Sequence, residues 1–290
     1  MNATTQTFVY LNHEYIPLEE AKISVMDRGF LFSDGIYEVI PVYGSAPFLP
    51  EDHYKRLQKN LEAIKIDLPF SYTDFMDVIQ ELIKRNTVQP IQSVYIEITR
   101  GVYPQRKQFV EGLTPTVFVK LESAECVSDL EHVLKVITVE DLRWEHCDIK
   151  GINRLANILM FQIAYYAHMD EAIIVNHSNV LEGCSSNVFI VEKNTVITPP
   201  LSNRLLNGVT RKMVIELVED FYTLKEETIS RKRLLSADEV FLTSSTKEVA
   251  SVGEIDGTII GSGKIGSVTR DIQRKYRQHI EHIVQKNLSK

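Results

Sequence analysis

A polar stretch at residues 122–130 interrupts a chain of 290 residues that otherwise alternates strand-like and amphipathic segments. The stretch is rich in serine and acidic side chains and holds few large apolar ones. Because a chain of this length exceeds one ordinary hydrophobic core, such a break indicates a boundary between domains. We therefore predict a small N-terminal domain at 1–122, a linker at 123–130 and a larger C-terminal domain at 131–290.

Both halves mix strand and helix patterns. Before the break, we predict strands at 7–11, 36–43, 93–100 and 116–121 and helices at 51–64 and 73–86. After it, we predict strands at 132–140, 172–176, 188–191, 196–198 and 239–243, helices at 153–168, from 208 and at 265–284, and a hairpin turn at Asp256-Gly257. In the second helix, Thr73 is the expected N-cap, and the buried stripe is Phe75, Val78, Ile79, Leu82 and Ile83. The predicted class is mixed α and β (α+β), in two domains.

The composition is that of a folded soluble protein, with 44% hydrophobic and 24% charged residues. The net charge of −7 argues against an anionic partner such as nucleic acid. The basic run Arg231-Lys232-Arg233 is interpreted as the solvated face of a helical turn.

The three cysteines, Cys126, Cys147 and Cys184, have a spacing that fits no metal site. The first ten residues are polar and poor in positive charge, and no apolar run reaches the roughly 18 residues of a membrane helix. We expect a cytoplasmic protein with reduced thiols and no membrane association.

Two segments hold side chains suited to carbonyl chemistry. Lys150, in Asp148-Ile149-Lys150-Gly151, could form a covalent bond with a carbonyl group if desolvation favoured its neutral amine. Glu182, followed by Gly183 and small polar residues to Asn187, could keep a pyridine nitrogen protonated so that the ring accepts electrons. Taken alone, each segment also fits an ordinary surface loop or β-turn.

Two further segments could bind a phosphate. Leu206-Asn207-Gly208-Val209-Thr210-Arg211 begins a helix, where free amides and the Thr210 hydroxyl attract an anion, although it also fits a simple helix cap. Thr243-Ser244-Ser245-Thr246 ends a strand with hydroxyls that could complete a phosphate cup, or it is a polar strand end.

The order and spacing of these segments resemble the fold-type IV pyridoxal-phosphate (PLP) enzymes over nearly the whole chain. This family includes D-amino-acid and branched-chain aminotransferases and aminodeoxychorismate lyase, and the resemblance is closest to the D-amino-acid aminotransferases. The matching motifs are Asp27–Gly29, Asp34–Val39, Thr99–Gly101, Arg143–Lys150, Glu182–Phe189, Asn207–Arg211 and Thr243–Thr246.

The resemblance implies a small α/β domain, a larger α/β barrel-like domain and a homodimer in which a partner loop completes each pocket. It implies that Lys150 is the Schiff-base lysine and carries the proton between the substrate Cα and the cofactor C4′. It assigns the pyridine nitrogen to Glu182 and the phosphate to Arg56. The backbone amides of Val209 and Thr210, with the hydroxyls of Thr210 and Ser245, would complete the phosphate cup, and Tyr37 would line the substrate pocket.

One segment departs from the family pattern. D-amino-acid aminotransferases usually bind the substrate carboxylate through a Pro-Arg-x-His-x-Phe motif, but here Gln105 stands at the arginine position and Lys107 at the histidine position. A desolvated carboxylate still needs a cation. We hypothesise that Lys107, Arg106 or Arg28 supplies it, while Arg106 and Lys107 also fit solvated loop charges.

The leading interpretation is a ping-pong aminotransferase acting on a D-amino acid and a 2-oxo acid. The alternatives on the same fold are an (R)-primary-amine or branched-chain transaminase and aminodeoxychorismate lyase, and a non-catalytic binding protein is the alternative of another class. Ile96–Gly101 lacks the Arg-Pro pattern expected of branched-chain specificity.

Overall fold

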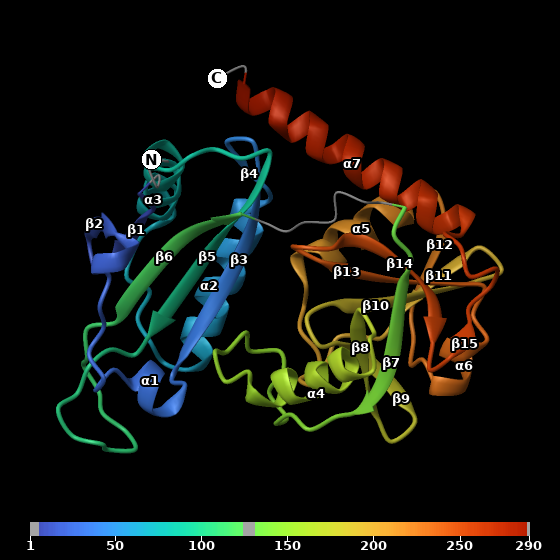
Figure 1. Ribbon diagram of the computed structural model, residues 1–290, viewed down its shortest axis with the longest axis horizontal. Coiled ribbons are helices and arrows are strands. Elements are labelled where there is room, and N and C mark those ends of the chain that lie inside the picture. Colours follow the sequence, from blue (N-terminus) through green and yellow to red (C-terminus); the bar gives the residue numbers. More distant parts are fainter. Residues whose placement is uncertain (1–5, 124–130, 289–290) are drawn as a thin grey trace. The chain divides into compact units, whose positions relative to one another are not determined.

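The computed structural model describes residues 6–123 and 131–288, which fall into two compact units (Figure 1). The first unit comprises 1–125, 149–153 and 283–290, and the second comprises 126–148 and 154–282. From residue 124 onward the predicted linker lies outside the described residues, and the predicted domain bounds stay a prediction.

The first unit is built on a six-stranded sheet in which every pairing is antiparallel. Its strands are β1 (Phe8–Leu11), β2 (Glu14–Pro17), β3 (Gly35–Tyr43), β4 (Ala46–Pro47), β5 (Ile91–Thr99) and β6 (Thr116–Ser123), in the order β2-β1-β6-β5-β3-β4. Its helices are η1 (Leu18–Glu20), α1 (Arg28–Phe32), α2 (Pro50–Ala63) and α3 (Tyr72–Arg85).

One face of this sheet carries the core of the first unit. Side chains alternate along the strands, so Val94, Ile96 and Ile98 of β5 are buried in one cluster with side chains of α2 and α3. The predicted stripe of α3 is confirmed: Phe75, Val78, Ile79, Leu82 and Ile83 all lie in this core. Tyr37 of β3 pairs with Glu97 of β5, and these two residues belong to the opposite face.

The predicted N-cap of α3 is wrong by two residues. Ser71, not Thr73, begins the helix: its hydroxyl accepts from the amide of Asp74, and the Asp74 carboxylate accepts from the amide of Ser71. This reciprocal pair satisfies two amides at once, which a single threonine cap at position 73 would not do.

The second unit holds a nine-stranded sheet. Its strands are β7 (Leu134–Glu140), β8 (Glu171–Asn176), β9 (Asn179–Gly183), β10 (Asn187–Glu192), β11 (Thr195–Thr198), β12 (Thr223–Glu226), β13 (Glu239–Ser244), β14 (Glu248–Ile255) and β15 (Thr258–Ile259). The order β10-β13-β14-β7-β8-β9 closes on itself because Glu182 of β9 also pairs with Asn187 of β10. The expectation of a barrel-like C-terminal fold is confirmed.

The helices of this part are α4 (Leu155–Tyr166), α5 (Val209–Glu219), α6 (Arg231–Leu235) and the part of α7 (Ser267–Leu288) that precedes residue 283. Met160 and Ala164 of α4 pack with Ala172 and Ile174 of β8. The Asp256-Gly257 turn is confirmed, with φ of 50° and 76° in the hairpin between β14 and β15. No helix in the described ranges combines the length and apolar character that a membrane span requires.

Candidate active site

Lys150 lies in a short segment that follows β7 in the chain but belongs to the first unit. The backbone fixes it there, because the Tyr37 amide donates to the Lys150 carbonyl over 3.0 Å and the Ile152 amide donates to the Gly35 carbonyl over 3.1 Å. Gly151 also forms a bridge with Ile36. The Lys150 Nζ lies 4.2 Å from the centre of the Tyr37 ring. The amine is therefore held on an aromatic surface of β3.

Behind β3, Arg56 of α2 forms a two-point ion pair with Glu38, and His53 Nδ1 lies 2.8 Å from the same carboxylate. Burial alone would raise the pKa of Glu38, but the ion pair and hydrogen bonds outweigh it and hold the pKa well below its usual value. Burial lowers the pKa of His53. Arg56 is therefore a rigid cation whose orientation is set by Glu38.

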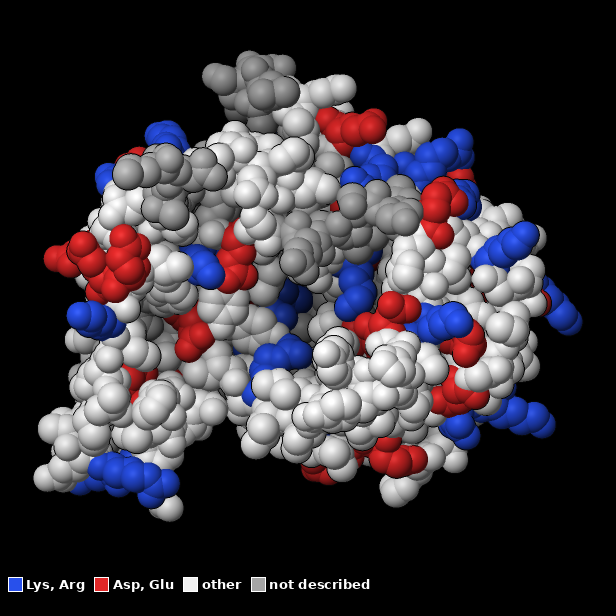
Figure 2. All heavy atoms as spheres, viewed as in Figure 1, with Lys and Arg blue, Asp and Glu red and all other residues white. Residues whose placement is uncertain are grey.

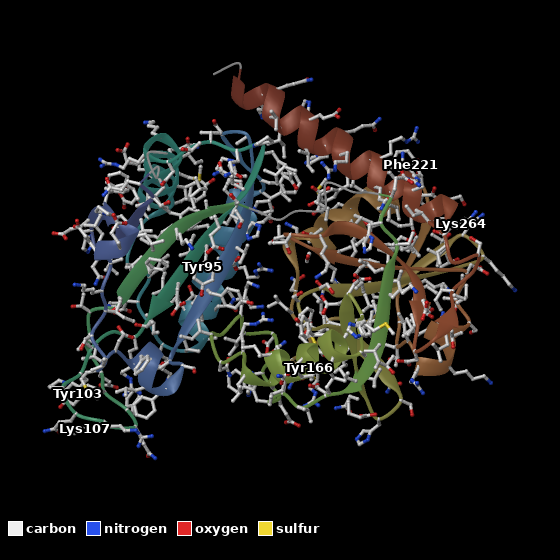
Figure 3. All side chains as sticks on the ribbon, in the orientation of Figure 1. Tyr95, Tyr103, Lys107, Tyr166, Phe221 and Lys264 are labelled. Atoms are coloured by element: carbon white, nitrogen blue, oxygen red, sulfur yellow. The ribbon has the colours of Figure 1, made fainter. Side chains whose placement is uncertain are left out.

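The sheet face that carries Tyr37 also carries Tyr95, labelled in Figure 3, whose ring centre lies 5.9 Å from that of Tyr37. The Tyr95 hydroxyl donates to Glu97 over 2.6 Å. Burial and this carboxylate both raise the pKa of Tyr95 far above its usual value, so its hydroxyl keeps its proton. Lys150 and Tyr37 are thus brought together with a second aromatic ring.

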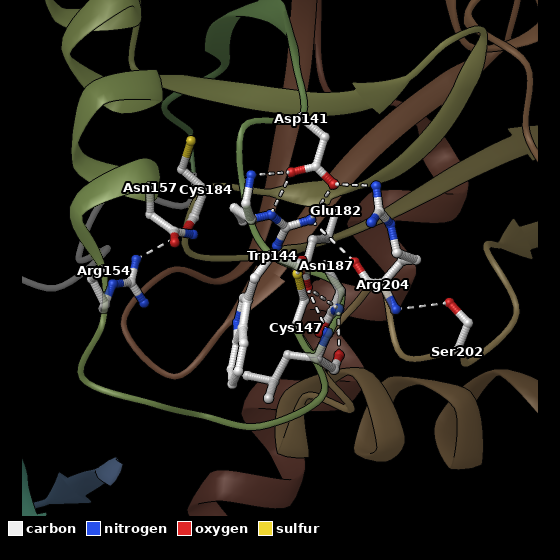
Figure 4. A network of polar contacts seen from close by, with 12 residues as sticks. Asp141, Trp144, Cys147, Arg154, Asn157, Glu182, Cys184, Asn187, Ser202 and Arg204 are labelled. Carbon is white, nitrogen blue, oxygen red and sulfur yellow. Dashed lines mark hydrogen bonds and ion pairs between the residues drawn. The ribbon is translucent and has the colours of Figure 1, made fainter. Parts of the chain in front are cut away.

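Glu182 lies on β9 of the second unit rather than in a loop, and it is 5% exposed (Figure 4). Arg143 Nη1 binds its Oε1, while the Leu206 amide over 2.9 Å and the Asn187 amide group over 3.4 Å donate to its Oε2. Arg143 is itself fixed by Asp141, with Nε 2.9 Å from Oδ1. Glu182 is therefore a buried carboxylate with cationic and neutral donors around it.

The next candidate lies at the start of α5, immediately after the Leu206 amide that binds Glu182. Gly208 precedes the helix, and no side chain caps the first amides, which belong to Val209 and Thr210. Asn187 bonds the Leu206 carbonyl over 2.9 Å. A Cβ on Gly208 would come within 2.1 Å of Asn187 Oδ1, so only glycine permits this approach. The helix start and the Glu182 carboxylate are thus joined through Asn187.

Ser245 lies in the turn between β13 and β14. The Lys247 Nζ anchors this turn, 2.9 Å from Glu171 Oε2 and 3.4 Å from Ser185 Oγ. Two buried hydroxyls nearby, Ser186 Oγ and Thr243 Oγ1, have no hydrogen-bond partner among the described residues. Since Thr243 pairs with Asn187, the turn and the Glu182 strand lie at one end of the second-unit sheet.

The segment around Gln105 and Lys107, which departs from the family's carboxylate-binding motif, lies in the exposed loop between β5 and β6. Figure 3 shows Tyr103 and Lys107 at its tip, and Figure 2 shows Lys and Arg side chains gathered there, at the lower left of the view. The Lys107 Nζ lies 5.5 Å from the centre of the Tyr103 ring. Arg106 lies over Phe32, at 4.9 Å. Arg28 is buried beside this loop, 3% exposed.

The ten candidate residues thus form two groups. Those in the first unit are Arg28, Tyr37, Arg56, Arg106, Lys107 and Lys150. Those in the second unit are Glu182, Val209, Thr210 and Ser245, all placed at one end of its sheet or at the helix start joined to it.

Comparison with known proteins decides the family. The sequence pattern of the amino-transferase class IV family matches residues 35–255, which is most of the chain. The chain belongs to this family. The aminotransferase is 39% identical over 278 residues to the D-alanine aminotransferase of Staphylococcus haemolyticus, covering 95% of this chain and 98% of that protein. It is 37% identical over 276 residues to the D-alanine aminotransferase of Bacillus licheniformis, covering 94% and 96%.

Solved structures of other aminotransferases have the same fold as this chain. The branched-chain aminotransferase of Thermoproteus uzoniensis with norvaline has a TM-score of 0.88 at 26% identity and covers 98% of both chains. The branched-chain aminotransferase of Thermobaculum terrenum in its PLP form has a TM-score of 0.86 at 23% identity, over 95% of this chain and 94% of that one. The predicted two-domain fold-type IV architecture is confirmed.

Several supporting residues of the aminotransferase received no role from the sequence. Asn187 lies in the same family motif as Glu182, and Arg143 begins the motif that holds Lys150, so membership of these motifs was the available signal. Lys247 follows the hydroxyl cluster directly, yet its partner Glu171 is 76 residues away. Such long-range ion pairs leave no trace in local spacing.

Proposed function

We propose that this protein is a PLP-dependent aminotransferase that moves an amino group between a D-amino acid and a 2-oxo acid, of the D-alanine and 2-oxoglutarate type, by a ping-pong mechanism. Aminotransferase chemistry follows from the family. The D-amino-acid substrate is supported by the names of relatives that are 39% and 37% identical over almost their whole length. The observation that carries the cofactor proposal is the buried Glu182 carboxylate held by Arg143.

The residues of the second unit fit PLP by their chemistry. A protonated pyridine nitrogen suits a buried carboxylate such as Glu182, whose Oε1 already binds the cation of Arg143. A phosphate suits the uncapped start of α5 at Val209 and Thr210 and the Ser245 turn. The buried Ser186 and Thr243 hydroxyls have no hydrogen-bond partner in the described chain, which also fits a polar ligand.

PLP, when bound, supplies a ring that withdraws electrons from the substrate carbon that loses its proton. Lys150 would hold the cofactor covalently until the amino group of the donor replaces it, and the amine freed in this way would take the proton from the substrate Cα and return it at C4′. Tyr37 orients this amine, since its ring lies 4.2 Å from Nζ and its amide binds the lysine carbonyl. Glu182, held as a carboxylate, would keep the pyridine nitrogen protonated.

We assign the phosphate to Arg56, the amides of Val209 and Thr210, and the hydroxyls of Thr210 and Ser245. Arg56 would contribute charge from a guanidinium that Glu38 orients. The helix start would contribute amides and the helix dipole. Arginine and helix amides together are well suited to a doubly charged phosphate.

We assign the substrate to Tyr37 and to a cation in the loop between β5 and β6. Lys107 and Arg106 are both exposed there, each lying over an aromatic ring. Lysine offers a point charge rather than a fork, so carboxylate binding through Lys107 would be less directional. Substituting Lys107→Ala and Arg106→Ala tests this: if neither raises the KM for a D-amino acid, the assignment is wrong.

A broader amine range is the second candidate function, because the two usual carboxylate anchors are replaced by Gln105 and Lys107. (R)-primary amines lack the carboxylate altogether and would tolerate this loss. The branched-chain alternative is supported only through shared fold, at 26% and 23% identity in the two structures compared above. Aminodeoxychorismate lyase would release pyruvate and need no oxo-acid acceptor.

We also propose that the protein is a homodimer acting in the cytoplasm. Helix α4 supports an association surface, because it exposes a run of large apolar side chains that a monomer would leave in water. These are Leu155, Ile158, Leu159, Phe161, Ile163, Tyr165 and Tyr166. Light scattering on the purified protein tests the dimer; a monomer at micromolar concentration contradicts it.

The function is tested by the visible absorption spectrum of the purified protein before and after adding D-alanine without an acceptor. Loss of the cofactor band with D-alanine, but not with L-alanine, supports both the half-reaction and the enantiomer. A cofactor band that is unchanged by D-alanine but lost on adding an (R)-amine favours the broader amine range. Absence of any band after added PLP, together with no change in Lys150→Ala, contradicts the role of Lys150.

A further inference from the structure

Arg28 is buried beside the loop between β5 and β6, and its guanidinium is engaged on three sides. Nε lies 2.8 Å from Asp34 Oδ2, Nη1 donates to the Lys107 carbonyl over 2.6 Å, and Nη2 donates to the Gln108 carbonyl over 2.7 Å. The two carbonyls belong to consecutive residues at the tip of the loop, 79 and 80 residues away in the chain. One side chain therefore fixes the backbone on which Lys107 stands.

Asp34 holds this guanidinium in place and is itself held by a second arginine. Arg100 binds it through two contacts, Nε to Oδ2 at 2.8 Å and Nη2 to Oδ1 at 2.9 Å. Burial alone would raise the pKa of Asp34, but the two arginines outweigh it and hold the pKa below its usual value. Arg100 also donates to the carbonyls of Ile64 and Lys65, at the end of α2. The anchor of the loop is thus connected to the core of the first unit.

The base of the loop is restrained as well. The Arg28 amide donates to the Gly101 carbonyl over 3.0 Å, and Asp27 forms a bridge with Val102. Gly101 has a φ of 99°, and a Cβ there would come within 2.0 Å of the Thr114 carbonyl. The loop therefore leaves β5 in a conformation that favours glycine.

Aromatic rings orient the exposed cations at the tip. Phe32 of α1 has Arg28 at 4.7 Å and Arg106 at 4.9 Å from its ring centre. Lys107 lies over Tyr103 in the same loop. Cation–π contacts of this kind restrict long side chains that would otherwise be free in solvent.

We infer that Arg28 is a positioning residue: it binds no substrate itself but holds the loop at 102–110 in one conformation, so that Lys107 and Arg106 present their charges to the substrate carboxylate. A flexible loop would lose conformational entropy when it bound a small anion, and a preformed loop avoids that loss. The inference rests on the proposed function only for the identity of the ligand, since the restraint of the loop is a property of the free protein.

The substitution Arg28→Lys separates positioning from simple charge. Lysine keeps a positive charge beside Asp34 but lacks the planar fork that reaches two carbonyls at once. Arg28→Gln removes the charge as well. The control is Arg85→Lys, which changes another arginine of the first unit, on α3, that pairs with Glu81 and lies over the Tyr15 ring of β2 rather than beside the loop.

The first measurement is hydrogen–deuterium exchange of the free protein, read at the backbone amides of 102–110. Loss of hydrogen bonds to a charged donor should accelerate this exchange roughly tenfold or more in both Arg28 variants and leave it unchanged in Arg85→Lys. Thermal unfolding of each variant identifies any general loss of fold. Wild-type exchange in Arg28→Lys overturns the inference.

The second measurement is steady-state kinetics. We expect Arg28→Lys to raise the KM for the amino donor roughly tenfold, with kcat changed much less, because the chemical groups are intact. A raised KM with unchanged loop exchange would make Arg28 a direct substrate cation and overturn positioning. Accelerated exchange with an unchanged KM would overturn the link to substrate. If the wild type transaminates no D-amino acid while loop exchange responds as expected, the proposed function fails and the restraint by Arg28 stands.

Discussion

Glu38 and Arg56 meet through two parallel contacts, Nε to Oε1 at 2.7 Å and Nη2 to Oε2 at 2.8 Å, with the carboxylate fully buried. The folded protein therefore binds a proton at Glu38 less readily than the unfolded chain. The resulting stabilisation is complete above the pKa that Glu38 has in the unfolded chain. It is lost as the pH falls through the lower pKa that Glu38 has in the folded protein.

The substitution Glu38→Gln should therefore make the free energy of unfolding depend less on pH in the acidic range. Wild-type unfolding free energy should fall as the pH decreases below the ordinary glutamate pKa of 4.5, and the variant should fall less steeply there. At neutral pH the variant should be less stable, because an amide cannot form the ion pair. Urea unfolding across pH measures both effects, with the partly exposed Glu81→Gln as control; parallel curves would contradict the prediction.

Replacing Arg56→Leu should cost about 3–5 kcal/mol of unfolding free energy, since it leaves the buried Glu38 carboxylate without its main counter-charge. Adding Glu38→Leu should restore part of the loss, because the double variant buries no unpaired charge. Denaturant unfolding of the two single variants and the double variant gives the coupling energy. Additive losses would mean that the pair does not act as a unit.

Two features of the fold, a core-facing helix stripe and a hairpin turn, could be predicted because they depend on local sequence. The stripe of α3 and the Asp256-Gly257 turn follow from side-chain spacing and from a residue pair that tolerates positive φ. The N-cap of α3 was misplaced because Ser71 and Thr73 are both acceptable caps, and only the reciprocal contact with Asp74 decides between them.

Less of the candidate site could be predicted. The motif around Glu182 is rich in Gly, Ser and Asn, which also fits a loop or β-turn, whereas pairing with β8 and β10 makes its first part a strand. The partners of Arg28 are backbone carbonyls of Lys107 and Gln108, and backbone groups carry no sequence signal. The segment that holds Lys150 pairs with Ile36, more than a hundred residues earlier.

Replacing Lys247→Met should loosen the turn that carries Ser245. Glu171 is fully buried, and Lys247 is its cationic partner among the described contacts, so truncation should cost roughly 3–5 kcal/mol. PLP affinity, measured by fluorescence titration of the apoprotein, should fall with it. Lys225→Met, which removes an exposed lysine, is the control. Unchanged stability and affinity would show that the ion pair has no supporting role.

Replacing Gly208→Ala should displace Asn187 without straining the backbone, because Gly208 has a φ of −65°. The added Cβ would lie 2.1 Å from Asn187 Oδ1, which must move. We expect a loss of about 1–3 kcal/mol and weaker PLP binding, since Asn187 contacts Glu182 and Leu206. Asn187→Ala should reproduce the weaker binding; if it binds PLP normally, crowding rather than the Asn187 contact is responsible.

The two described cysteines should resist alkylation in the native protein. Burial raises the pKa of Cys147 to about 11 and that of Cys184 to about 12, so few thiolates exist at pH 8. Mass spectrometry after brief iodoacetamide treatment should find both unmodified, and both labelled once the protein is unfolded in urea. Rapid native labelling of Cys184 would contradict its burial.

The segment at 149–153 has a consequence for dividing this polypeptide. Its backbone bonds to Gly35 and Tyr37 make it part of the first unit, although its covalent neighbours on both sides belong to the second. Cleavage near residue 125 would therefore leave the N-terminal fragment without the strand-like segment that borders β3, while Lys150 would remain on the other fragment. Complementation between two separately expressed fragments should then depend on rebinding of residues 149–153 to β3, and Lys150 would be supplied by the C-terminal fragment although its backbone partners lie in the N-terminal one.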